Sequence, residues 1–434
     1  MSLRQKQKGR RLARLLKSHN FDFADAKTNY PPHSLHAFPA KFPPQLAAFL
    51  IERLTEPGES VLDPMVGSGT CLVESQRLGR KAFGFDVDPL AVFLTKAKTR
   101  IPKVSELWRA YNRVISRAKR LLRRKSFLRR EFERRFDKFD RQFLKFWFPL
   151  RSRKELLALA ISIEEVVGRK AGLSAWLQAM FSSIIITKES GASFARDLSH
   201  SRPHRSNEKH FKSPLALLDK RFGRVLDQMA RARVSSGGVP TKVGIADCRK
   251  RIPLGEESVD LVVTSPPYAT AIDYLRAHKF SLIWMGYSLL EIADIRKKHI
   301  GSRRDGKVNR DCLPVSLRRK IRIIAKSSRR QARALEWYFA DLCRTLKEIY
   351  RVLKPGAALV MVVGACFSNG NRVETHRHVL HLMRGAGFKV CGWARREINR
   401  DRRMLPVSAN GNGKSRIERR IHHEYLVGAI KPPA

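Results

Sequence analysis

The sequence predicts an α/β protein whose core is a Rossmann-like, mostly parallel sheet. A short apolar strand, Ser60–Asp63, runs into a loop that carries Gly67 and Gly69. A helix at about residues 71–78 follows the loop, and a second short strand then ends at Asp86. Far downstream, another apolar strand opens into a rigid loop with two consecutive prolines. A strand, a glycine loop, a helix and a strand that ends in an acid form the nucleotide-binding half of such a sheet.

The glycine loop, which reads DPMVGSGT at residues 63–70, indicates the kind of ligand. Its glycines let the backbone approach a ligand closely, and the acid after the second strand is placed to accept from ribose hydroxyls. The third glycine of the dinucleotide fingerprint is missing, and no Gly-Lys-Ser/Thr follows as in a P-loop. A nucleoside without phosphates, such as S-adenosylmethionine, therefore fits better than a pyrophosphate. The cofactor-binding candidates are Asp63, Met65, Gly67, Ser68, Gly69, Thr70 and Asp86.

The double-proline loop reads Ser265-Pro266-Pro267-Tyr268 and follows the apolar run Val259–Thr264. Two prolines fix the backbone and remove two N–H donors, so the nearby carbonyl groups are free to accept hydrogen bonds. A serine hydroxyl and an aromatic ring flank them, and together they suit the amino group and the face of a planar base. A plain proline-rich turn is the simpler interpretation of this tetrapeptide, and the upstream glycine loop favours the functional one.

These motifs carry a resemblance to a known family. DPMVGSGT, GFDVDP at residues 84–89 and TSPPY at residues 264–268 look like those of the amino-methylating DNA methyltransferases, and most closely the N4-cytosine group. The segment His33–Pro44 also resembles the element that precedes the cofactor loop in that family. The likeness covers roughly residues 30–95 and 240–430. It implies a mixed seven-stranded sheet, S-adenosylmethionine as cofactor, and site-specific methylation of DNA of the restriction–modification kind.

The resemblance also implies roles for individual residues. The target base leaves the duplex, its amino group meets the Ser265 hydroxyl and the Pro266 carbonyl, and Tyr268 stacks on it. The predicted catalytic set is thus Ser265, Pro266, Pro267 and Tyr268. Three further cofactor contacts are expected: Asp247 beside the adenine, unless it only caps its strand, and His36 and Lys41 at the cofactor's carboxylate. Met65 stands where phenylalanine is usual in the family.

Several functions remain open at this stage. The Ser-Pro-Pro-Tyr loop also serves methylation of adenine N6, because the chemistry at an aromatic amine is the same. An RNA base methyltransferase would suit the basic chain equally, although RNA enzymes of this chemistry more often carry Asp or Asn before Pro-Pro-Tyr. A catalytically inactive nucleic-acid-binding protein is the third alternative. Methylation of cytosine N4 in double-stranded DNA is the favoured interpretation.

Charge and composition point to the partner. The chain carries 87 Lys and Arg against 39 Asp and Glu, a formal charge of +48, which predicts a polyanionic partner. The six cysteines are scattered without a Cys-x-x-Cys pair, so we expect a reducing compartment and no metal site. No cysteine stands in the Pro-Cys arrangement of C5-cytosine methyltransferases. Neither a signal peptide nor a membrane-length apolar run is present, and we expect a cytoplasmic protein.

The order of these features predicts the domain organisation. A long basic insertion separates the two halves of the methyltransferase domain, and apolar residues recur in it at three- and four-residue steps, as in helices. Its residues 100–154 hold 20 Lys or Arg against 5 Asp or Glu. The predicted regions are a basic N-terminal arm (1–29), the cofactor-binding half (30–99), the helical insertion (100–235), which is a candidate nucleic-acid-binding or target-recognition region, and the catalytic half (240–434) with a second basic insertion at about 296–333.

Overall fold

A computed structural model of the chain shows how these segments fold. It describes residues 3–39, 41–168, 171–187, 190–197, 203–206, 210–232, 238–269, 273–302, 306–364, 366–368, 371–398 and 421–433. Arg202, Lys209 and Arg303-Arg304, which contribute to the basic segments predicted from the sequence, lie outside these residues.

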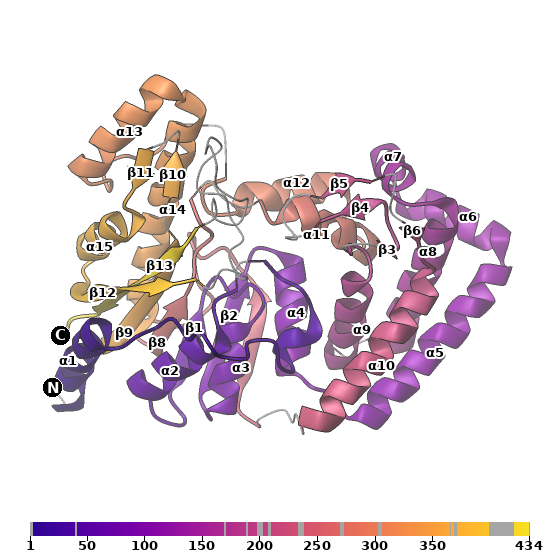
Figure 1. The fold of residues 1–434 in the computed structure, drawn as a ribbon, viewed down its shortest axis with the longest axis horizontal. Coiled ribbons are helices and arrows are strands. Elements are labelled where there is room, and N and C mark those ends of the chain that lie inside the picture. Colours follow the sequence, from indigo (N-terminus) through magenta and orange to yellow (C-terminus); the bar gives the residue numbers. More distant parts are fainter. Residues whose placement is uncertain are drawn as a thin grey trace.

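The centre of the molecule is the predicted mixed sheet of seven strands (Figure 1). The strand order is β12-β13-β9-β8-β1-β2-β7. Only β13 runs antiparallel to its neighbours β9 and β12; the other pairings are parallel. The strands are β1 (Ser60–Asp63), β2 (Lys81–Asp86), β7 (Thr241–Ile245), β8 (Val259–Thr264), β9 (Leu353–Gly364), β12 (Lys389–Glu397) and β13 (His423–Ile430). The antiparallel pair β12 and β13 makes the sheet mixed, as the resemblance implied.

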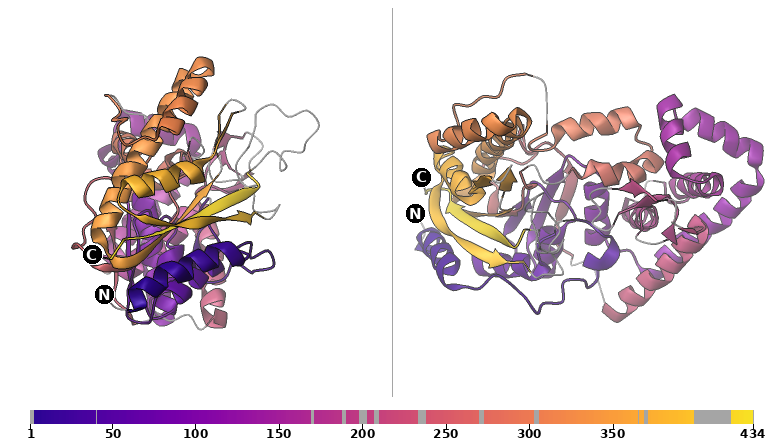
Figure 2. Two further views of the ribbon diagram at one scale, coloured as in Figure 1. Left: turned by 90° about the vertical axis from the view of Figure 1, so that its left-hand side faces the viewer. Right: turned by 45° about the horizontal axis from the view of Figure 1, so that its top comes forward.

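Helices cover both faces of this sheet because its strands are apolar on both sides. On one face, Leu12 and Leu16 of α1 (Leu3–Ser18) pack with α2 (Pro44–Leu54) and α3 (Thr70–Arg77). On the other face lie α13 (Val315–Ser327), α14 (Arg329–Val352) and α15 (Thr375–Gly385). Figure 2 shows indigo α1 and the orange helices on opposite sides of the yellow strands. Residues 3–18 of the predicted arm are therefore part of the packed domain.

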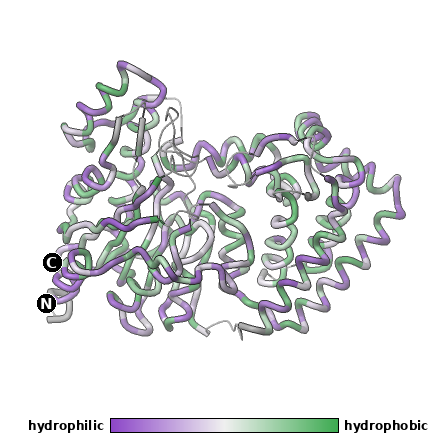
Figure 3. The backbone as a smooth tube through the Cα atoms, viewed as in Figure 1, coloured by the Kyte–Doolittle hydropathy of each residue, from purple (hydrophilic) through white to green (hydrophobic). Residues whose placement is uncertain are grey.

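The first insertion folds into a helical module beside the cofactor-binding half (Figure 1). Its helices are α5 (Val104–Arg123), α6 (Lys125–Arg135), α7 (Lys138–Trp147), α8 (Leu150–Val167), α9 (Ala171–Ser183) and α10 (Pro214–Ala232). Hydrophilic and hydrophobic residues alternate along α5 and α10, as expected for helices with one buried face (Figure 3). The apolar core of this module is continuous with Leu90, Leu94 and Ala97 of α4 (Pro89–Thr99) and with α11 (Leu275–Leu282).

Short elements complete the described chain. They are the strands β3 (Ser190–Gly191), β4 (Ala195–Arg196), β5 (His204–Arg205), β6 (His210–Phe211), β10 (Cys366–Ser368) and β11 (Asn371–Val373), the helix α12 (Leu289–Lys298), and the 3-10 turns His33–Leu35 and Ile283–Met285. None of the helices in the described ranges is both long enough and apolar enough to cross a membrane.

Candidate active site

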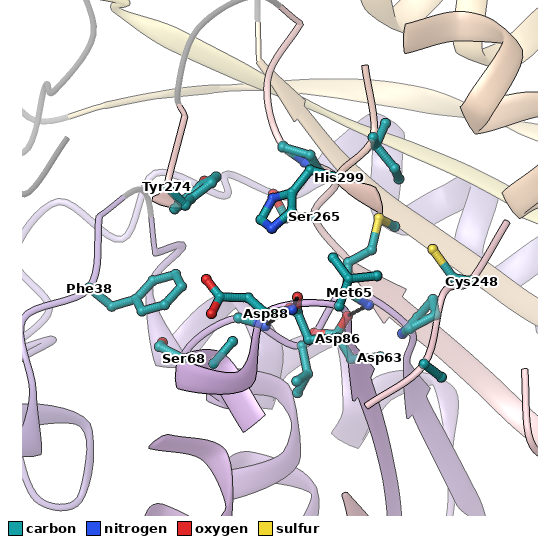
Figure 4. A pocket seen from close by; sticks show the side chains of 18 of the residues that line it. Phe38, Asp63, Met65, Ser68, Asp86, Asp88, Cys248, Ser265, Tyr274 and His299 are labelled. Atoms are coloured by element: carbon teal, nitrogen blue, oxygen red, sulfur yellow. Dashed lines mark hydrogen bonds between the residues drawn. The ribbon is translucent and has the colours of Figure 1, made fainter. Parts of the chain in front are cut away.

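A cavity lies where the carboxyl ends of four neighbouring parallel strands meet (Figure 4). Asp63 ends β1, Asp86 ends β2, and Asp247 and Ser265 follow β7 and β8 closely. Ligands in open α/β sheets bind at this edge because the connecting loops part there. The cavity contains about 840 Å³ of empty space, some of it open to solvent.

The glycine loop forms one wall of the cavity, and its backbone is held from two sides. The Gly67 N–H donates to Asp86 Oδ2 at 2.9 Å. Behind the loop, Thr95 Oγ1 donates to the Gly67 carbonyl at 3.2 Å and Lys98 Nζ donates to the Ser68 carbonyl at 2.8 Å. Gly69 has a φ of +81°, and a Cβ atom there would lie 2.8 Å from Thr95 Oγ1. Glycine is therefore required at this position for both conformation and space.

Asp63, which is buried, and Asp86, which is half-buried, place two carboxyl groups in the cavity wall. Burial raises the pKa of Asp63 to about 7, although Thr264 and the Met65 N–H donate to its Oδ1 at 2.6 and 3.1 Å. Burial and the nearby Asp88 raise the pKa of Asp86 to about 6. A cationic ligand that also donates hydrogen bonds would favour the ionised form of both groups. The donor set therefore fits S-adenosylmethionine, which carries a sulfonium, an ammonium and ribose hydroxyls.

The Ser-Pro-Pro-Tyr loop contributes two of its four residues to the cavity. Ser265 and Pro267 line it, whereas Pro266 and Tyr268 are not among the lining residues. The Tyr268 ring lies against Gly364, where an added Cβ would come within 2.6 Å of the ring. The Tyr268 hydroxyl donates to Glu424, which also accepts from Arg396 at 2.8 Å. The ring thus stands next to the cavity wall, fixed on one side by β9 and β13.

Some of the remaining predicted cofactor contacts line the cavity, and others do not. Lys41 and Asp247 line the cavity. The Asp247 carboxylate is already bound by Arg249, whose Nε and Nη2 donate to it at 2.8 and 2.6 Å. His36 lies away from the lining: its Nδ1 donates to the Ala37 carbonyl at 2.7 Å, and its Nε2 bonds with Ser182 Oγ at 2.9 Å. Met65, Gly67, Ser68 and Thr70 line the cavity, and Gly69 is outside the lining set.

Four further residues of the cavity were not predicted as site residues from the sequence. Phe38, Asp88, Tyr274 and His299 also line it (Figure 4). Asp88 bonds with Nδ1 of the buried His278 at 2.5 Å; burial alone would raise the pKa of Asp88, but His278 lowers it below its usual value. Among the described residues, His299 Nε2 is buried without a hydrogen-bond partner. Only the DVDP sequence around Asp88, which resembles the helix start Asp-Pro, hinted at any of them.

Comparison with known proteins agrees with this geometry. Residues 4–96 match the model of a family described as DNA methylase. The type II methyltransferase M.MvaI of Kocuria varians is 26% identical over 364 residues, which are 79% of this chain and 78% of that protein. The type II methyltransferase M.MjaII of Methanocaldococcus jannaschii is 27% identical over 124 residues, 29% of this chain and 23% of that protein.

Methyltransferases are also among the solved structures with a detectable likeness. A DNA modification methylase of Thermus thermophilus in complex with S-adenosylmethionine is 19% identical, with a TM-score of 0.24, over 44% of this chain and 52% of that chain. An S-adenosylmethionine-dependent methyltransferase of Methanosarcina mazei is 10% identical, with a TM-score of 0.32, over 89% and 98% of the two chains. The fold assignment itself rests on the strand order of the sheet.

Sheet order, cavity and cofactor chemistry define a Rossmann-like methyltransferase dependent on S-adenosylmethionine. Residues of the glycine loop line its cavity together with Ser265 and Pro267 of the Ser-Pro-Pro-Tyr loop. Within that class, the motifs of the chain, the family match over residues 4–96 and the type II relatives are similar to amino-methylating DNA methyltransferases.

Proposed function

We propose that this protein transfers a methyl group from S-adenosylmethionine to the N4 amino group of a cytosine in double-stranded DNA. The observation that carries the proposal is the shared cavity: Ser265 and Pro267 line the same space as Asp63 and Asp86. Groups suited to an amino group and groups suited to a nucleoside cofactor therefore meet at one place. Methyl transfer requires this, because positioning of the two reactants supplies much of the reduction in the barrier.

The exocyclic amine determines what the protein must do. Its lone pair is shared with the ring, so the nitrogen is a poor nucleophile. In our proposal the Ser265 hydroxyl and the Pro266 carbonyl accept hydrogen bonds from its two N–H groups, which draws electron density onto the nitrogen and orients it. Bound S-adenosylmethionine supplies the electrophilic methyl group. Gly67 and Asp86 would hold the cofactor in the cavity that Ser265 also lines.

The target base has to leave the duplex to reach Ser265. We propose that Tyr268 stacks on the extruded base. The support for this role is that its ring is fixed against Gly364 and its hydroxyl is bonded to Glu424, so the ring is held in one orientation without an induced rearrangement. A preorganised ring reduces the entropy lost when the base binds.

Cytosine is proposed ahead of adenine on the loop sequence. A serine before Pro-Pro-Tyr is the usual signature of the N4-cytosine group that the chain resembles. The type II methyltransferase names of its relatives support DNA as the polymer, and the charge of +48 supports a polyanion in general.

The test is to incubate the protein with labelled S-adenosylmethionine and unmethylated duplex DNA, digest the DNA, and identify the labelled nucleoside by mass. We expect N4-methylcytosine. Label in N6-methyladenine, or in RNA offered in parallel, would replace the proposal by that alternative. Absence of label in both polymers, with cofactor binding intact, would leave an inactive nucleic-acid-binding protein. Ser265→Ala is the matched variant: it should bind the cofactor normally and lose at least about 100-fold in transfer, which corresponds to one lost transition-state hydrogen bond.

A further inference from the structure

The outer face of α7 has a composition that its own fold does not explain. Five residues on this face are exposed: Lys138, Phe139, Gln142, Lys145 and Phe146. The opposite face is anchored in the module by the buried Leu144 and by Phe143 and Trp147. Phe139 is 65% exposed and Phe146 is 53% exposed. Two large aromatic side chains two helical turns apart on an otherwise polar face are typical of a binding surface.

The charged residues of this face have one sign. None of its five residues is acidic; the nearest acids on α7 and its cap are Asp137, which caps the helix, and Asp140, which is buried beneath it. A cation from a neighbouring element adds to the face: the Arg205 guanidinium of β5 lies 5.0 Å from the Phe146 ring centre. Aromatic rings interleaved with cations suit a nucleic acid, which offers phosphates and base surfaces together.

Helix α12 connects the inner side of α7 to the active-site cavity. At its N-terminal end, the Leu289 N–H donates to Asp140 Oδ1 of α7 at 2.9 Å. At its C-terminal end, Lys298 lines the cavity. Figure 1 shows α12 between the methyltransferase sheet and α7. Ten helical residues span about 15 Å, which corresponds to four or five base pairs of duplex at about 3.4 Å each. A duplex with its target base in the cavity would therefore bring neighbouring base pairs to α7.

We propose that the outer face of α7 is the surface that binds and reads the duplex beside the target base. Lys138 and Lys145 contact phosphates, Phe139 and Phe146 pack against base edges, and the Gln142 amide hydrogen-bonds a base in the groove. This inference rests on the proposed function, because it takes duplex DNA as the substrate. It assigns target recognition to the first basic insertion rather than to the second.

The second insertion serves as the contrast. The outer face of α13 is also free of acids, but it presents Val315, Arg319, Arg322, Ile323 and Lys326 without an aromatic ring or an amide. Arginine and lysine side chains on such a face suit phosphate contacts, which are independent of base sequence.

The experiment uses the full chain and two readouts. Binding of a fluorescent duplex, measured by anisotropy without cofactor, tests α7 whether or not the protein transfers methyl groups. Sequencing of methylated positions in a long unmethylated DNA tests recognition. Phe139→Ala/Phe146→Ala should weaken duplex binding about tenfold or more, and Gln142→Ala should broaden the set of methylated sites. Lys138→Gln/Lys145→Gln should lower the salt dependence of binding by close to two counterions. Cofactor affinity and melting temperature should stay at their wild-type values.

The control is Trp108→Ala on α5, because Trp108 is 54% exposed and belongs to the same module. It should leave binding and recognition unchanged. The proposal is overturned if the α7 variants bind and methylate like the wild type, or if Trp108→Ala has the same effect. It is also overturned if the wild type is a dimer that the α7 variants dissociate, since the face would then join two copies of the chain. If the wild type transfers no methyl group, and the α7 variants still bind duplex less well than the wild type does, the result counts against the proposed function alone.

Discussion

Two acids, the buried Asp63 and the half-buried Asp86, lie in the wall of the candidate cavity. Each is removed from water at a strand end, and each has a pKa well above its usual value because of burial. Without ligand, ionisation of these groups costs free energy. A cationic ligand reverses that cost, so part of the energy of cofactor binding comes from completing an environment that the protein leaves electrostatically unbalanced.

Cofactor affinity should therefore depend on pH. Binding of a cation favours the ionised carboxylates, so affinity should rise between about pH 5.5 and 7.5, and binding should release protons. Calorimetry in buffers of different ionisation enthalpy measures the number released. Asp63→Asn should release fewer protons near the pKa values of the pair. An unchanged proton count in this variant would show that Asp63 does not titrate on binding.

The raised pKa of Asp63 also predicts how the stability of the protein depends on pH. The folded-state pKa of Asp63 is raised above its unfolded value, so its protonated form stabilises the fold, and this contribution is lost as the pH rises from about 4 to 7. Asp63→Asn should consequently gain melting temperature relative to the wild type at about pH 8, and the gain should shrink at about pH 5. Thermal unfolding at both values, followed by circular dichroism, gives the comparison.

Gly364 gives a test of Tyr268 that leaves the tyrosine itself in place. A methyl group on Gly364 would displace the ring, because the added Cβ would lie 2.6 Å from it. Gly364→Ala should reduce the rate of transfer with little change in cofactor affinity. Tyr268→Phe, which keeps the ring and loses the bond to Glu424, should retain more activity than Tyr268→Ala. Equal loss in Phe and Ala variants would mean that the hydroxyl, and not the ring, is the important part.

At the scale of elements, α4 shapes the glycine loop from behind. Lys98 is almost completely buried, and its ammonium donates to the Ser68 carbonyl, while Thr95 holds the Gly67 carbonyl. Burial lowers the pKa of Lys98 well below its usual value, so the lysine is costly to keep. Its use lies in fixing the conformation of the loop through the loop's carbonyl groups.

The variant Lys98→Met separates the cost of burying the lysine charge from the effect of the lysine on the glycine loop. Methionine fills similar space without a buried charge, so the melting temperature should not fall. The Ser68 carbonyl loses its donor, and cofactor affinity should fall several-fold, measured by calorimetry. Lys98→Ala should in addition leave a void and destabilise the fold by about 2 kcal/mol or more. A methionine variant with wild-type affinity would show that the loop holds its shape unaided.

The sequence predicted those elements whose local pattern is strong. Strand β1, the glycine loop and β2 follow directly from apolar runs that end at Gly or Asp. The local pattern is weaker at the start of helix α14, which begins at Arg329, because its first turns carry many polar residues that hide the apolar stripe. The cavity contacts of Tyr274, Asp88 and His299 could not be predicted, since each depends on how distant helices pack. For the same reason, His36 could be assigned to a motif but not placed relative to the cavity.

At the scale of the whole molecule, the charge of +48 should govern DNA binding. The logarithm of the affinity should fall linearly with the logarithm of the salt concentration, with a slope near −0.9 per phosphate contact. Arg319→Gln/Arg322→Gln on α13 should lower the slope by about two and weaken all duplex sequences equally. Titrations of several duplexes between about 50 and 300 mM salt provide the measurement. A sequence-dependent loss in this variant would instead assign base recognition to α13.

The helical module shares one continuous core with α4 and α11 of the methyltransferase domain. A recognition part built this way cannot be exchanged between relatives as a unit, because its removal would strip the apolar cover from the helix that supports the cofactor loop. New specificities in this lineage would then arise by substitution of single residues on outer helix faces, with the architecture unchanged. For engineering, the same constraint favours libraries of surface substitutions over grafted domains.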